Sequence, residues 1–381
     1  AKLRKHIDNL FIPKTVKNID EKSYITYESE PEKITSEERA KVQKGAVTIN
    51  NIQIENKNFD VNILSKLLDK VTCNKDEVLK QLEENKGEYI SGGQLATNLN
   101  VSRNSIWKAI KTLEKDGYSI NAIPNKGYCL EPDNDILSPQ SIEQYLNYPL
   151  DLSVYKTITS RSSTNTVLKE KAEQSAPHGT VLIATEQTLG RGRMGKKFYS
   201  PSNTGLYISI LVRPDIPADQ ALFLTTSAAV ATAKAIEDVS NKKADIKWVN
   251  DIYIEGKKVC GILTEAAFNI ETSKLDYAIV GIGINVCPPE GGFPEDISEI
   301  ATAIFEKSSD AVNKRSILVG HLLNYFMEYY ESFDKRAYLD EYISRSMIIG
   351  QPISVLSNGT SRNALALEID KECHLKVRYE D

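Results

Sequence analysis

The chain of 381 residues lacks an apolar run long enough to cross a bilayer, so we expect no membrane partner. No basic segment followed by an apolar stretch opens it, so we expect no secretory signal. Its five cysteines form no CxxC pair, and its four histidines show no HExxH spacing. These absences argue against a disulfide framework and a zinc site, and they favour a reducing, cytoplasmic location.

An excess of charge of one sign is also missing. The net charge is −5 at pH 7, which argues against a protein whose whole surface binds nucleic acid but leaves room for one small DNA-binding module. Charged residues make up 26% of the chain and hydrophobic residues 41%. A chain of this length and composition can form two or three domains, each with its own core.

The first 72 residues form an unassigned N-terminal extension, 1–72. Residues 23–44 are rich in Glu, Lys and Ser and poor in large apolar side chains, which predicts a stretch without fixed structure. Residues 46–54 alternate like one strand, and residues 61–71 have the pattern of a short helix. No motif that carries chemistry occurs in this extension.

Residues 73–132 have the pattern of a winged helix-turn-helix domain. Helical spacing over residues 75–85 is followed by a capping box at Ser91, which starts a short second helix. Ser102 caps a third helix. Residues 118–130 then predict a hairpin, the wing.

The third helix and the wing carry the candidate DNA contacts. Small polar and basic side chains lie off the apolar stripe of the helix, and such side chains suit base edges and phosphates in a major groove. A protein-interaction surface, or simply a solvated polar face, is the alternative interpretation. The candidate DNA-binding residues are Ser102, Arg103, Asn104, Ser105, Lys108, Lys111 and Lys126.

The rest of the chain predicts an α+β multidomain fold. Residues 133–340 mix strand-like runs, such as 181–185 and 206–212, with helical runs, such as 219–239. This mixture predicts a central mixed α/β domain of catalytic size. Residues 341–381 have the pattern of short strands joined by turns, which predicts a small C-terminal SH3-like β domain.

A glycine-rich basic loop, GRGRMG, occupies residues 190–195. It satisfies the dinucleotide-binding pattern GxGxxG, but such a loop must open a helix, and the following KKFYSP starts a helix poorly. Arginines in a flexible loop are better suited to gripping a carboxylate or a phosphate. The alternative is an ordinary solvated basic loop.

Three further motifs are polar or rich in glycine. KWVND at 247–251 and KKVCGILTE at 257–265 form a predicted hairpin that projects a lysine into a cleft, although one of two adjacent lysines is usually a plain surface charge. STN at 163–165 has the pattern of a helix cap. GIGIN at 281–285 would let a flat ligand lie against the backbone.

Taken in order, the STN, GRGR-x-G, KW-x-ND, K-x-x-GIL-x-E and G-x-GIN motifs resemble those of the biotin–protein ligase family, which includes bifunctional biotin ligase/repressors. The resemblance runs from about residue 75 to residue 381. It implies an ATP-dependent enzyme that forms biotinyl-AMP and then attaches biotin to a lysine of the biotin carboxyl carrier domain of a carboxylase. It also implies Mg²⁺, operator DNA, a homodimer and biotin-responsive repression.

By position in these motifs, the resemblance assigns roles to single residues. Arg193, Lys258 and Asp251 would be catalytic, and Asp251 would also be a candidate Mg²⁺ ligand. The implied biotin site comprises Ser163, Thr164, Asn165, Gln187, Gly190, Arg191, Arg193, Lys258, Gly261, Leu263 and Gly281. The implied ATP and adenylate site comprises Arg191, Arg193, Trp248, Asn250, Lys258 and Asn285.

Two features depart from the family pattern. Residues 1–72 match nothing in it, and the C-terminal domain stops at Asp381, where members usually continue for one or two short strands, so we expect a shortened domain. Three alternatives are a DNA-binding biotin sensor with weak or no ligase activity, a lipoate or octanoate ligase, and a nucleotide-dependent oxidoreductase. The complete set of basic residues argues against the first, and the GRGR loop argues against the second.

Overall fold

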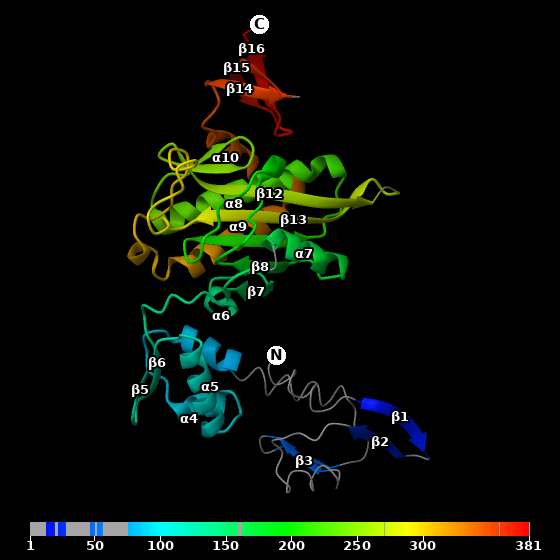
Figure 1. Cartoon of the computed structure of the whole chain (residues 1–381), viewed down its shortest axis with the longest axis vertical. Coiled ribbons are helices and arrows are strands. Elements are labelled where there is room, and N and C mark those ends of the chain that lie inside the picture. Colours follow the sequence, from blue (N-terminus) through cyan, green and yellow to red (C-terminus); the bar gives the residue numbers. More distant parts are fainter. Residues whose placement is uncertain are drawn as a thin grey trace. The chain divides into compact units, whose positions relative to one another are not determined.

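The computed structural model divides into two compact units, Ala1–Pro132 and Asp133–Asp381. It describes residues 75–380 apart from 159–161, 270 and 358, and it describes four strands within the first 74 residues. Figure 1 labels the elements along the chain. Among the described residues, no helix has the length and apolar character that a membrane span requires.

Two antiparallel hairpins come from the N-terminal extension. β1 (Pro13–Ile19) pairs with β2 (Lys22–Tyr27). β3 (Ala46–Ile49) pairs with β4 (Ile52–Glu55). Within the extension, the structure describes these four strands.

Two expectations for the extension were wrong. Residues 46–54 contain two paired strands instead of one, and the sequence between the strands is Asn-Asn, a pair of residues that favours turns. Residues 23–27, expected to lack fixed structure, belong to β2, where Tyr and Ile residues suit a strand. The helix expected over 61–71 lies outside the described residues.

The winged helix-turn-helix is confirmed. A helix over residues 75–84 is followed by α4 (Gly92–Asn98) and α5 (Arg103–Lys115). Both predicted caps are present, because Ser91 forms a full capping box and Ser102 accepts the hydrogen bond of a first-turn N–H. β5 (Ile120–Ile123) and β6 (Gly127–Leu130) form the antiparallel wing. The buried core of this domain includes Val78, Leu82, Leu95, Ile106, Ile110 and Leu113.

A seven-stranded sheet forms the centre of the second unit (Figure 1). Its order is β10-β11-β12-β13-β9-β8-β7, and all neighbours are antiparallel except β7 and β8. The strands are β7 (Asp151–Tyr155), β8 (Thr180–Ala184), β9 (Gly205–Val212), β10 (Asp245–Lys247), β11 (Asp251–Ile254), β12 (Lys257–Asn269) and β13 (Lys274–Asn285).

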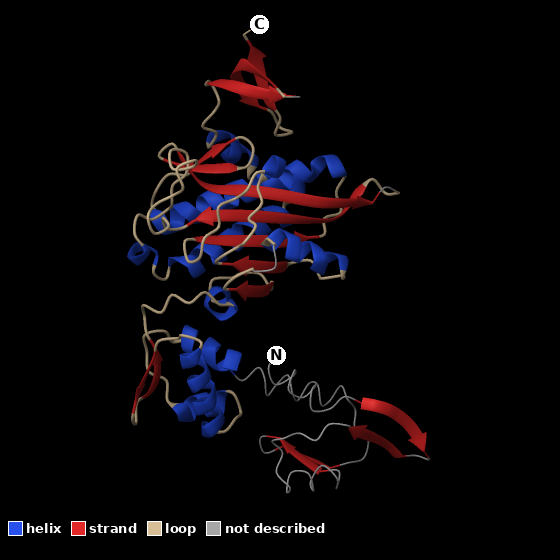
Figure 2. Cartoon of the chain, viewed as in Figure 1, coloured by secondary structure: helices blue, strands red, loops and turns tan. Residues whose placement is uncertain are grey.

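Helices cover both faces of this sheet. Figure 2 shows α8 (Ala221–Ser240) and α9 (Lys314–Glu331) on one face and α7 (Thr164–Glu173) on the other. Ile208 and Ile210 of β9 pack in the core under α8 and α9, whereas Leu211 packs with residues of α7. Since side chains alternate along a strand, odd-numbered residues of β9 lie on the α7 face.

Smaller elements complete the second unit. A short helix, α6 (Pro139–Glu143), is capped by Ser138. After α9 come α10 (Leu339–Ser344) and a three-stranded antiparallel sheet of β14 (Pro352–Ser357), β15 (Thr360–Ile369) and β16 (Leu375–Tyr379). The predicted α+β fold, with a small C-terminal β domain, is therefore confirmed.

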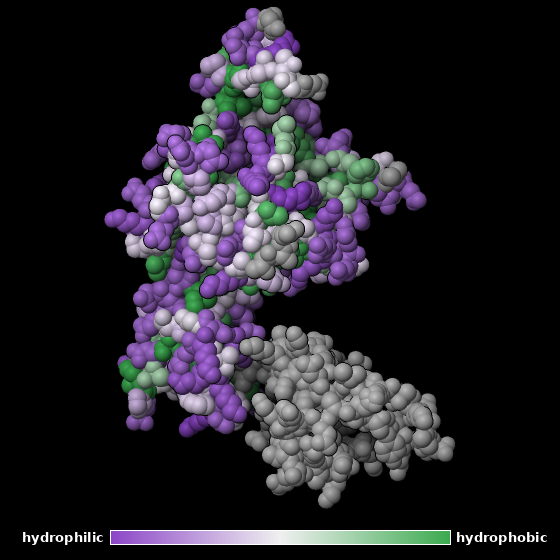
Figure 3. All heavy atoms as spheres, in the orientation of Figure 1, coloured by the Kyte–Doolittle hydropathy of each residue, from purple (hydrophilic) through white to green (hydrophobic). Residues whose placement is uncertain are grey.

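The surface of the second unit is mostly hydrophilic on the face seen in Figure 3. Hydrophobic surface gathers at the outer end of the β12–β13 hairpin, where Phe268 is 61% exposed. The buried hydrophobic residues lie mainly between the sheet and the α8–α9 pair. The α7 face is therefore the one on which polar groups can gather.

Candidate active site and nucleic-acid interface

Three glycines form a floor on the α7 face of the sheet. Gly261 of β12 lies opposite Gly283 of β13. Gly281 lies opposite Leu263 on one side and opposite Ser209 of β9 on the other. We call Gly261, Gly281 and Gly283 the glycine floor.

The glycine floor is closely covered by other groups. A Cβ atom at Gly281 would lie 2.2 Å from Asn165 Oδ1. A Cβ atom at Gly283 would lie 2.8 Å from the Phe198 ring, and the same ring lies 3.3 Å from a Cβ position at Gly261. Only glycine fits at Gly281 and Gly283 without a shift, so planar groups can lie directly on the backbone here.

Buried polar side chains border the floor. Ser163 caps α7, and Thr164 donates to Gln187 Oε1 through its backbone N–H at 2.7 Å and through its hydroxyl at 3.2 Å. The Ser209 hydroxyl donates to Asn165 Oδ1 at 2.6 Å and lies 2.8 Å from Thr164 Oγ1. The structure thus brings two predicted biotin-site residues, Thr164 and Asn165, to one serine of β9, and Gln187 joins them through Thr164.

The amide group of Asn165 connects three elements. Its Nδ2 donates to the Leu263 carbonyl at 3.2 Å and to Glu265 at 3.0 Å, while its Oδ1 accepts from Ser209. These bonds join α7 to β12 and β9. Because both ends of the amide are engaged within the protein, Asn165 is suited to holding the wall of the site.

The glycine-rich loop is fastened to the sheet at two points. Arg191 Nη1 lies 3.1 Å from Glu265 Oε1, and Arg193 Nη1 donates to Asn250 Oδ1 at 3.0 Å. Both arginines are exposed. At the base of the loop, a Cβ atom at Gly190 would lie 2.2 Å from the carbonyl oxygen of Phe198. The loop therefore has a tightly packed base and carries two exposed cations, each held by one polar partner that it can exchange for an anion.

The two adjacent lysines of β12 have different partners. Lys258 Nζ lies 2.7 Å from Asp251 Oδ1, with the two side chains 29% and 24% exposed. A Cβ position at Gly261 lies 3.2 Å from the same Nζ. Lys257 instead donates to the Ser298 carbonyl at 3.3 Å. Lys258 is therefore the lysine at the glycine floor, and Lys257 lies apart from it.

Two predicted adenylate-site residues bond elsewhere. Trp248 Nε1 donates to the Cys373 carbonyl at 2.9 Å, and Asn285 Nδ2 donates to the Thr302 carbonyl at 3.0 Å. Neither side chain is joined to the cluster around Lys258 by a hydrogen bond that the structure records. Trp248 lies in the turn between β10 and β11, and Asn285 is the last residue of β13.

Sequence reasoning missed three residues of the site. Ser209 is a serine inside the buried, mainly apolar strand β9, and a polar residue in such a strand is a sequence signal of a functional role. Glu265 closes the K-x-x-GIL-x-E motif and received no role, although it contacts Arg191. Phe198 follows the basic loop, and nothing local in the sequence predicts that its ring lies on the glycine floor.

Burial dominates the pKa shifts near the site. It raises the pKa of Tyr207 to about 12 and also raises the pKa values of Tyr253 and of the Cys260 thiol. These groups stay protonated at neutral pH, so none of them is an ionised nucleophile. The charges available for chemistry are those of Arg191, Arg193, Lys258 and the carboxylates beside them.

The donor set fits a magnesium ion better than a transition metal. In the part of the chain that the structure describes, no three His, Cys, Asp or Glu side chains gather at a metal site. Asp251 supplies one carboxylate next to the predicted phosphate-binding residues. Mg²⁺ is commonly held by one or two carboxylates, substrate phosphates and water, so Asp251 fits such an ion.

The candidate nucleic-acid interface lies on α5 and the wing. Arg103, Asn104 and Lys108 are exposed, and Lys111 is exposed while paired with a neighbouring glutamate at 2.6 Å. Lys126 of the wing lies 4.3 Å from the centre of the Tyr89 ring. The structure therefore places these predicted contacts on solvent-facing surface.

The serines at the start of α5 have a local role. Ser102 accepts a hydrogen bond from the Ser105 N–H at 3.1 Å, and the two hydroxyls lie 3.0 Å apart. Sequence reasoning missed Trp107, which is 51% exposed. Trp107 follows Asn104 by three residues and Arg103 by four, so it lies on the same helix face as these candidate DNA contacts and off the apolar stripe. This spacing was the sequence signal that Trp107 belongs to the candidate interface.

Fold and site define a class of protein. Residues 157–285 match the Biotin/lipoate A/B protein ligase family, and residues 74–129 match the HTH domain family. The chain is therefore a ligase-fold protein of this class that also carries a helix-turn-helix domain.

Individual relatives narrow this class. Bifunctional ligase/repressor BirA of Bacillus spizizenii is 37% identical over 248 residues, which are 65% of this chain and 75% of that protein. The protein of the same name from Salmonella typhimurium is 29% identical over 297 residues, 74% of this chain and 90% of its own. The structure of biotin protein ligase from Aquifex aeolicus in complex with biotin and ATP is 26% identical, with a TM-score of 0.50, over 60% of this chain and 94% of that one. The chain belongs to the family of BirA-like bifunctional ligase/repressors, as the motifs predicted.

Proposed function

We propose that this chain is an ATP-dependent biotin–protein ligase that also acts as a biotin-responsive transcriptional repressor. The observation that carries the ligase proposal is the meeting of the glycine floor with Lys258, whose Nζ lies 3.2 Å from a Cβ position at Gly261. Arg193 reaches the neighbouring Asn250. A flat surface with cations at its edge suits biotin, whose carboxylate must meet the triphosphate of ATP.

The first half-reaction brings two anions together. A carboxylate oxygen of biotin attacks the α-phosphorus of ATP, a C–O–P mixed anhydride forms, and the bond to pyrophosphate breaks. Lys258 turns from Asp251 to the carboxyl oxygen, and Arg193 turns to the phosphates. Preorganised cations lower the barrier because they offset the repulsion and the charge that develops.

In the second half-reaction, the amine nitrogen of a carrier lysine attacks the acyl carbon of biotinyl-AMP. An amide bond forms, the amine loses a proton, and AMP leaves with the bonding electrons. Asp251 orients either Mg²⁺ or the incoming lysine. The loop over residues 190–195 closes over the mixed anhydride and keeps water from it.

The remaining residues bind and orient the substrates. The polar residues at the start of α7 and Gln187 face the ureido ring of biotin. The biotin site comprises Ser163, Thr164, Asn165, Gln187, Gly190, Arg191, Arg193, Lys258, Gly261, Leu263 and Gly281. Trp248, Asn250 and Asn285 lie on the side of the adenylate, and Asp251 would hold a Mg²⁺ ion, which would offset phosphate charge.

The winged helix binds operator DNA, and a dimer presents two such helices to a two-fold site. The acceptor is the biotin carboxyl carrier domain of a biotin-dependent carboxylase, and the protein works in the cytoplasm. Four segments divide these tasks: an extension without an assigned role (1–72), the DNA-binding domain (73–132), the ligase domain (133–340) and the small β domain (341–381).

Release of pyrophosphate tests the ligase proposal. With biotin, ATP and Mg²⁺ we expect biotinyl-AMP and pyrophosphate in equal amounts. Lipoate and octanoate, added in turn, should give little product and should compete poorly with biotin. Preferential use of either acid would favour the lipoate-type alternative, and the absence of any adenylate would favour the sensor that lacks ligase activity.

A further inference from the structure

Two hydrogen bonds, one buried and one partly buried, join the KWVND motif to the C-terminal part of the chain. The Tyr342 hydroxyl of α10 donates to the Val249 carbonyl at 2.9 Å, and these residues are 0% and 3% exposed. Trp248 Nε1 donates to the Cys373 carbonyl, in the turn between β15 and β16, at 2.9 Å. Consecutive residues of the motif are thus bonded to two different C-terminal elements.

The chain after α10 also extends the sheet beyond β10. The Ile246 N–H donates to the Arg345 carbonyl at 2.8 Å, and the Met347 N–H donates to the Ile246 carbonyl at 3.0 Å. This short parallel pairing lies directly before the KWVND motif. The backbone on both sides of Lys247 is therefore tied to residues 342–347.

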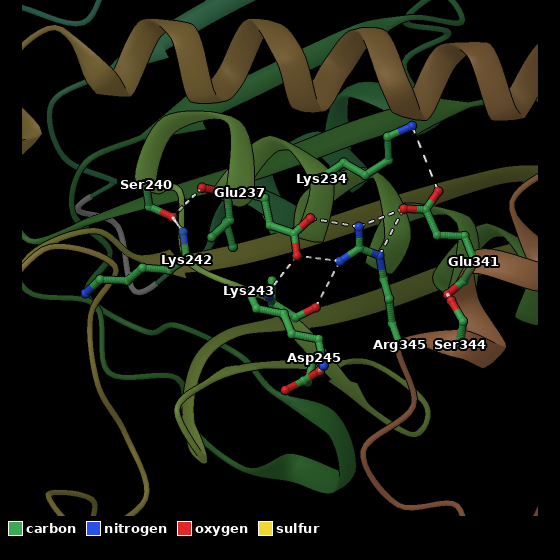
Figure 4. A network of polar contacts seen from close by, with 11 residues as sticks. Lys234, Glu237, Ser240, Lys242, Lys243, Asp245, Glu341, Ser344 and Arg345 are labelled. Atoms are coloured by element: carbon green, nitrogen blue, oxygen red, sulfur yellow. Dashed lines mark hydrogen bonds and ion pairs between the residues drawn. The ribbon is translucent and has the colours of Figure 1, made fainter.

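The side chain of Arg345 holds this connection in place (Figure 4). Its guanidinium pairs with Glu237 of α8 at 2.7 Å and with Glu341 of α10 at 2.7 Å, and it donates to the Ala244 carbonyl at 3.1 Å. The hydrogen bonds that the guanidinium donates to the two carboxylates raise the pKa of Arg345 further, so the charge is permanent. A single guanidinium thus joins α8, α10 and the residue before β10.

The held segment carries two polar groups of the candidate site. Asn250 accepts from Arg193 at 3.0 Å and donates to the Ile262 carbonyl at 2.7 Å. Asp251 lies 2.7 Å from Lys258. Val249, which accepts from Tyr342, is the residue immediately before this pair.

We propose that Tyr342 and Arg345 are positioning residues for the ATP half of the site. They hold residues 244–249 so that Asn250 and Asp251 meet Arg193 and Lys258. Neither residue touches substrate. This inference rests on the proposed ligase function and predicts that the use of ATP depends on the C-terminal contacts much more strongly than biotin binding does.

The selectivity follows from where the two sets of contacts lie. The polar array expected to face biotin comes from α7, from β9 and from Gln187, which precedes the glycine-rich loop. Thr164 is hydrogen-bonded to both Gln187 and Ser209. No hydrogen bond that the structure records joins these three side chains to residues 338–347. Arg193 and Lys258, which the proposed biotin and ATP sites share, do contact the held segment. Loss of a C-terminal contact should therefore change the affinity for biotin alone much less than KM for ATP.

The chain offers a matched pair of tyrosines for the test. Tyr338, just before α10, is 1% exposed, and its hydroxyl, away from the motif, donates to the Phe223 carbonyl at 3.1 Å and lies 3.0 Å from Thr226 Oγ1. Tyr342→Phe and Tyr338→Phe each remove one buried hydroxyl and leave one carbonyl without that donor. Because Tyr338→Phe also removes the contact with Thr226, we expect it to lose at least as much thermal stability as Tyr342→Phe. Only Tyr342→Phe should raise KM for ATP, by about fivefold, as the loss of one hydrogen bond implies.

The measurements are KM for ATP and kcat in pyrophosphate release, and calorimetric affinity for biotin in the absence of ATP, all on the full chain. Equal ATP kinetics for the two variants, or a matching loss of biotin affinity in Tyr342→Phe, would overturn the inference. If the wild-type chain makes no biotinyl-AMP while it binds biotin, the ligase proposal has failed instead.

Arg345→Lys provides a second, independent variant. Lysine keeps the charge but cannot span both carboxylates and the Ala244 carbonyl. We expect a rise in KM for ATP in the same direction, again with a much smaller change in biotin affinity. A folded Arg345→Lys protein with wild-type ATP kinetics would remove Arg345 from the proposal, and the same result for both variants would end it.

Discussion

At the scale of single residues, the site depends on glycines, which leave room for neighbouring groups, as much as on its polar and charged side chains. Gly281 leaves room for Asn165, and Gly283 leaves room for the Phe198 ring. Lys258 and Lys257 are neighbours in sequence, yet β-strand alternation sends them to different partners. Such a difference makes adjacent residues useful as test and control.

Lys258→Ala should slow biotinyl-AMP formation by about a hundredfold or more, because a preorganised cation at developing charge is typically worth that factor. We expect the same of Arg193→Ala. Pyrophosphate release at saturating substrate measures the effect. Lys257→Ala is the control and should keep nearly the wild-type rate. Rates near wild type for Lys258→Ala would refute the assigned role.

Ser209→Ala tests the polar array at the glycine floor. Its hydroxyl lies between Thr164 and Asn165, and its loss leaves buried polar atoms without that partner. We expect KM for biotin to rise about tenfold. Ser227 of α8 is about as buried, and in the structure its hydroxyl bonds only a backbone carbonyl of its own helix. The control Ser227→Ala should therefore leave KM for biotin unchanged. Equal effects of the two changes would show that the array is not part of the biotin site.

At the scale of elements, the sequence predicted the regular structure well where local signals exist. The caps at Ser91, Ser102 and Ser163 placed three helix starts correctly because each serine bonds a first-turn N–H. The single strand expected over residues 46–54 was wrong because alternation alone does not reveal a reversal. Local pattern also predicted the β12 strand that carries Lys258.

What the sequence did not reveal are contacts between distant segments. Trp248 was expected at the adenylate, and nothing near it in sequence announces the Cys373 carbonyl 125 residues away. The Tyr342–Val249 bond and the Phe198 ring on the glycine floor are of the same kind. These contacts come from packing in three dimensions, which no local spacing encodes.

The recognition helix α5 permits a test of two kinds of DNA contact. Trp107→Ala should weaken specific DNA binding by about tenfold and leave the salt dependence unchanged, because an apolar side chain contacts base edges without displacing ions. Lys108→Ala should reduce the slope of log affinity against log salt by about one. Fluorescence anisotropy over a range of salt concentrations measures both. A wild-type affinity for Trp107→Ala would place this residue outside the interface.

The Arg345 cluster predicts a loss of stability in acid. Burial alone would raise the pKa of Glu237, but hydrogen bonds from Arg345 and from the Ala244 N–H lower it below its ordinary value of 4.5. A carboxyl group whose pKa is lowered by folding stabilises the fold at a pH above its unfolded-state pKa. This stabilisation is lost as the pH falls through the lower pKa of the folded state. Glu237→Gln should thus be less stable than wild type at pH 7, with the difference shrinking below pH 4.5. Urea unfolding at several pH values measures this, and a constant difference would contradict it.

At the scale of the whole molecule, a ligase unit and a DNA-binding unit share one chain. Under the proposed function, bound ligand would order the glycine-rich loop and favour a dimer whose two winged helices match two half-sites, so we expect biotin with ATP to tighten operator binding. Gel shifts on biotin-operon operator DNA, with and without biotin and ATP, measure the change. Equal affinity in both conditions would separate the two activities.

The most direct test of the central claim is mass spectrometry of a carrier lysine. A biotin carboxyl carrier domain is incubated with the full chain, biotin, ATP and Mg²⁺. The proposed function predicts that one lysine gains biotin, that AMP and pyrophosphate are released, and that Lys258→Ala gives almost no product while Lys257→Ala gives the normal amount. An unmodified carrier with the wild-type chain, or equal labelling by Lys258→Ala, would contradict it.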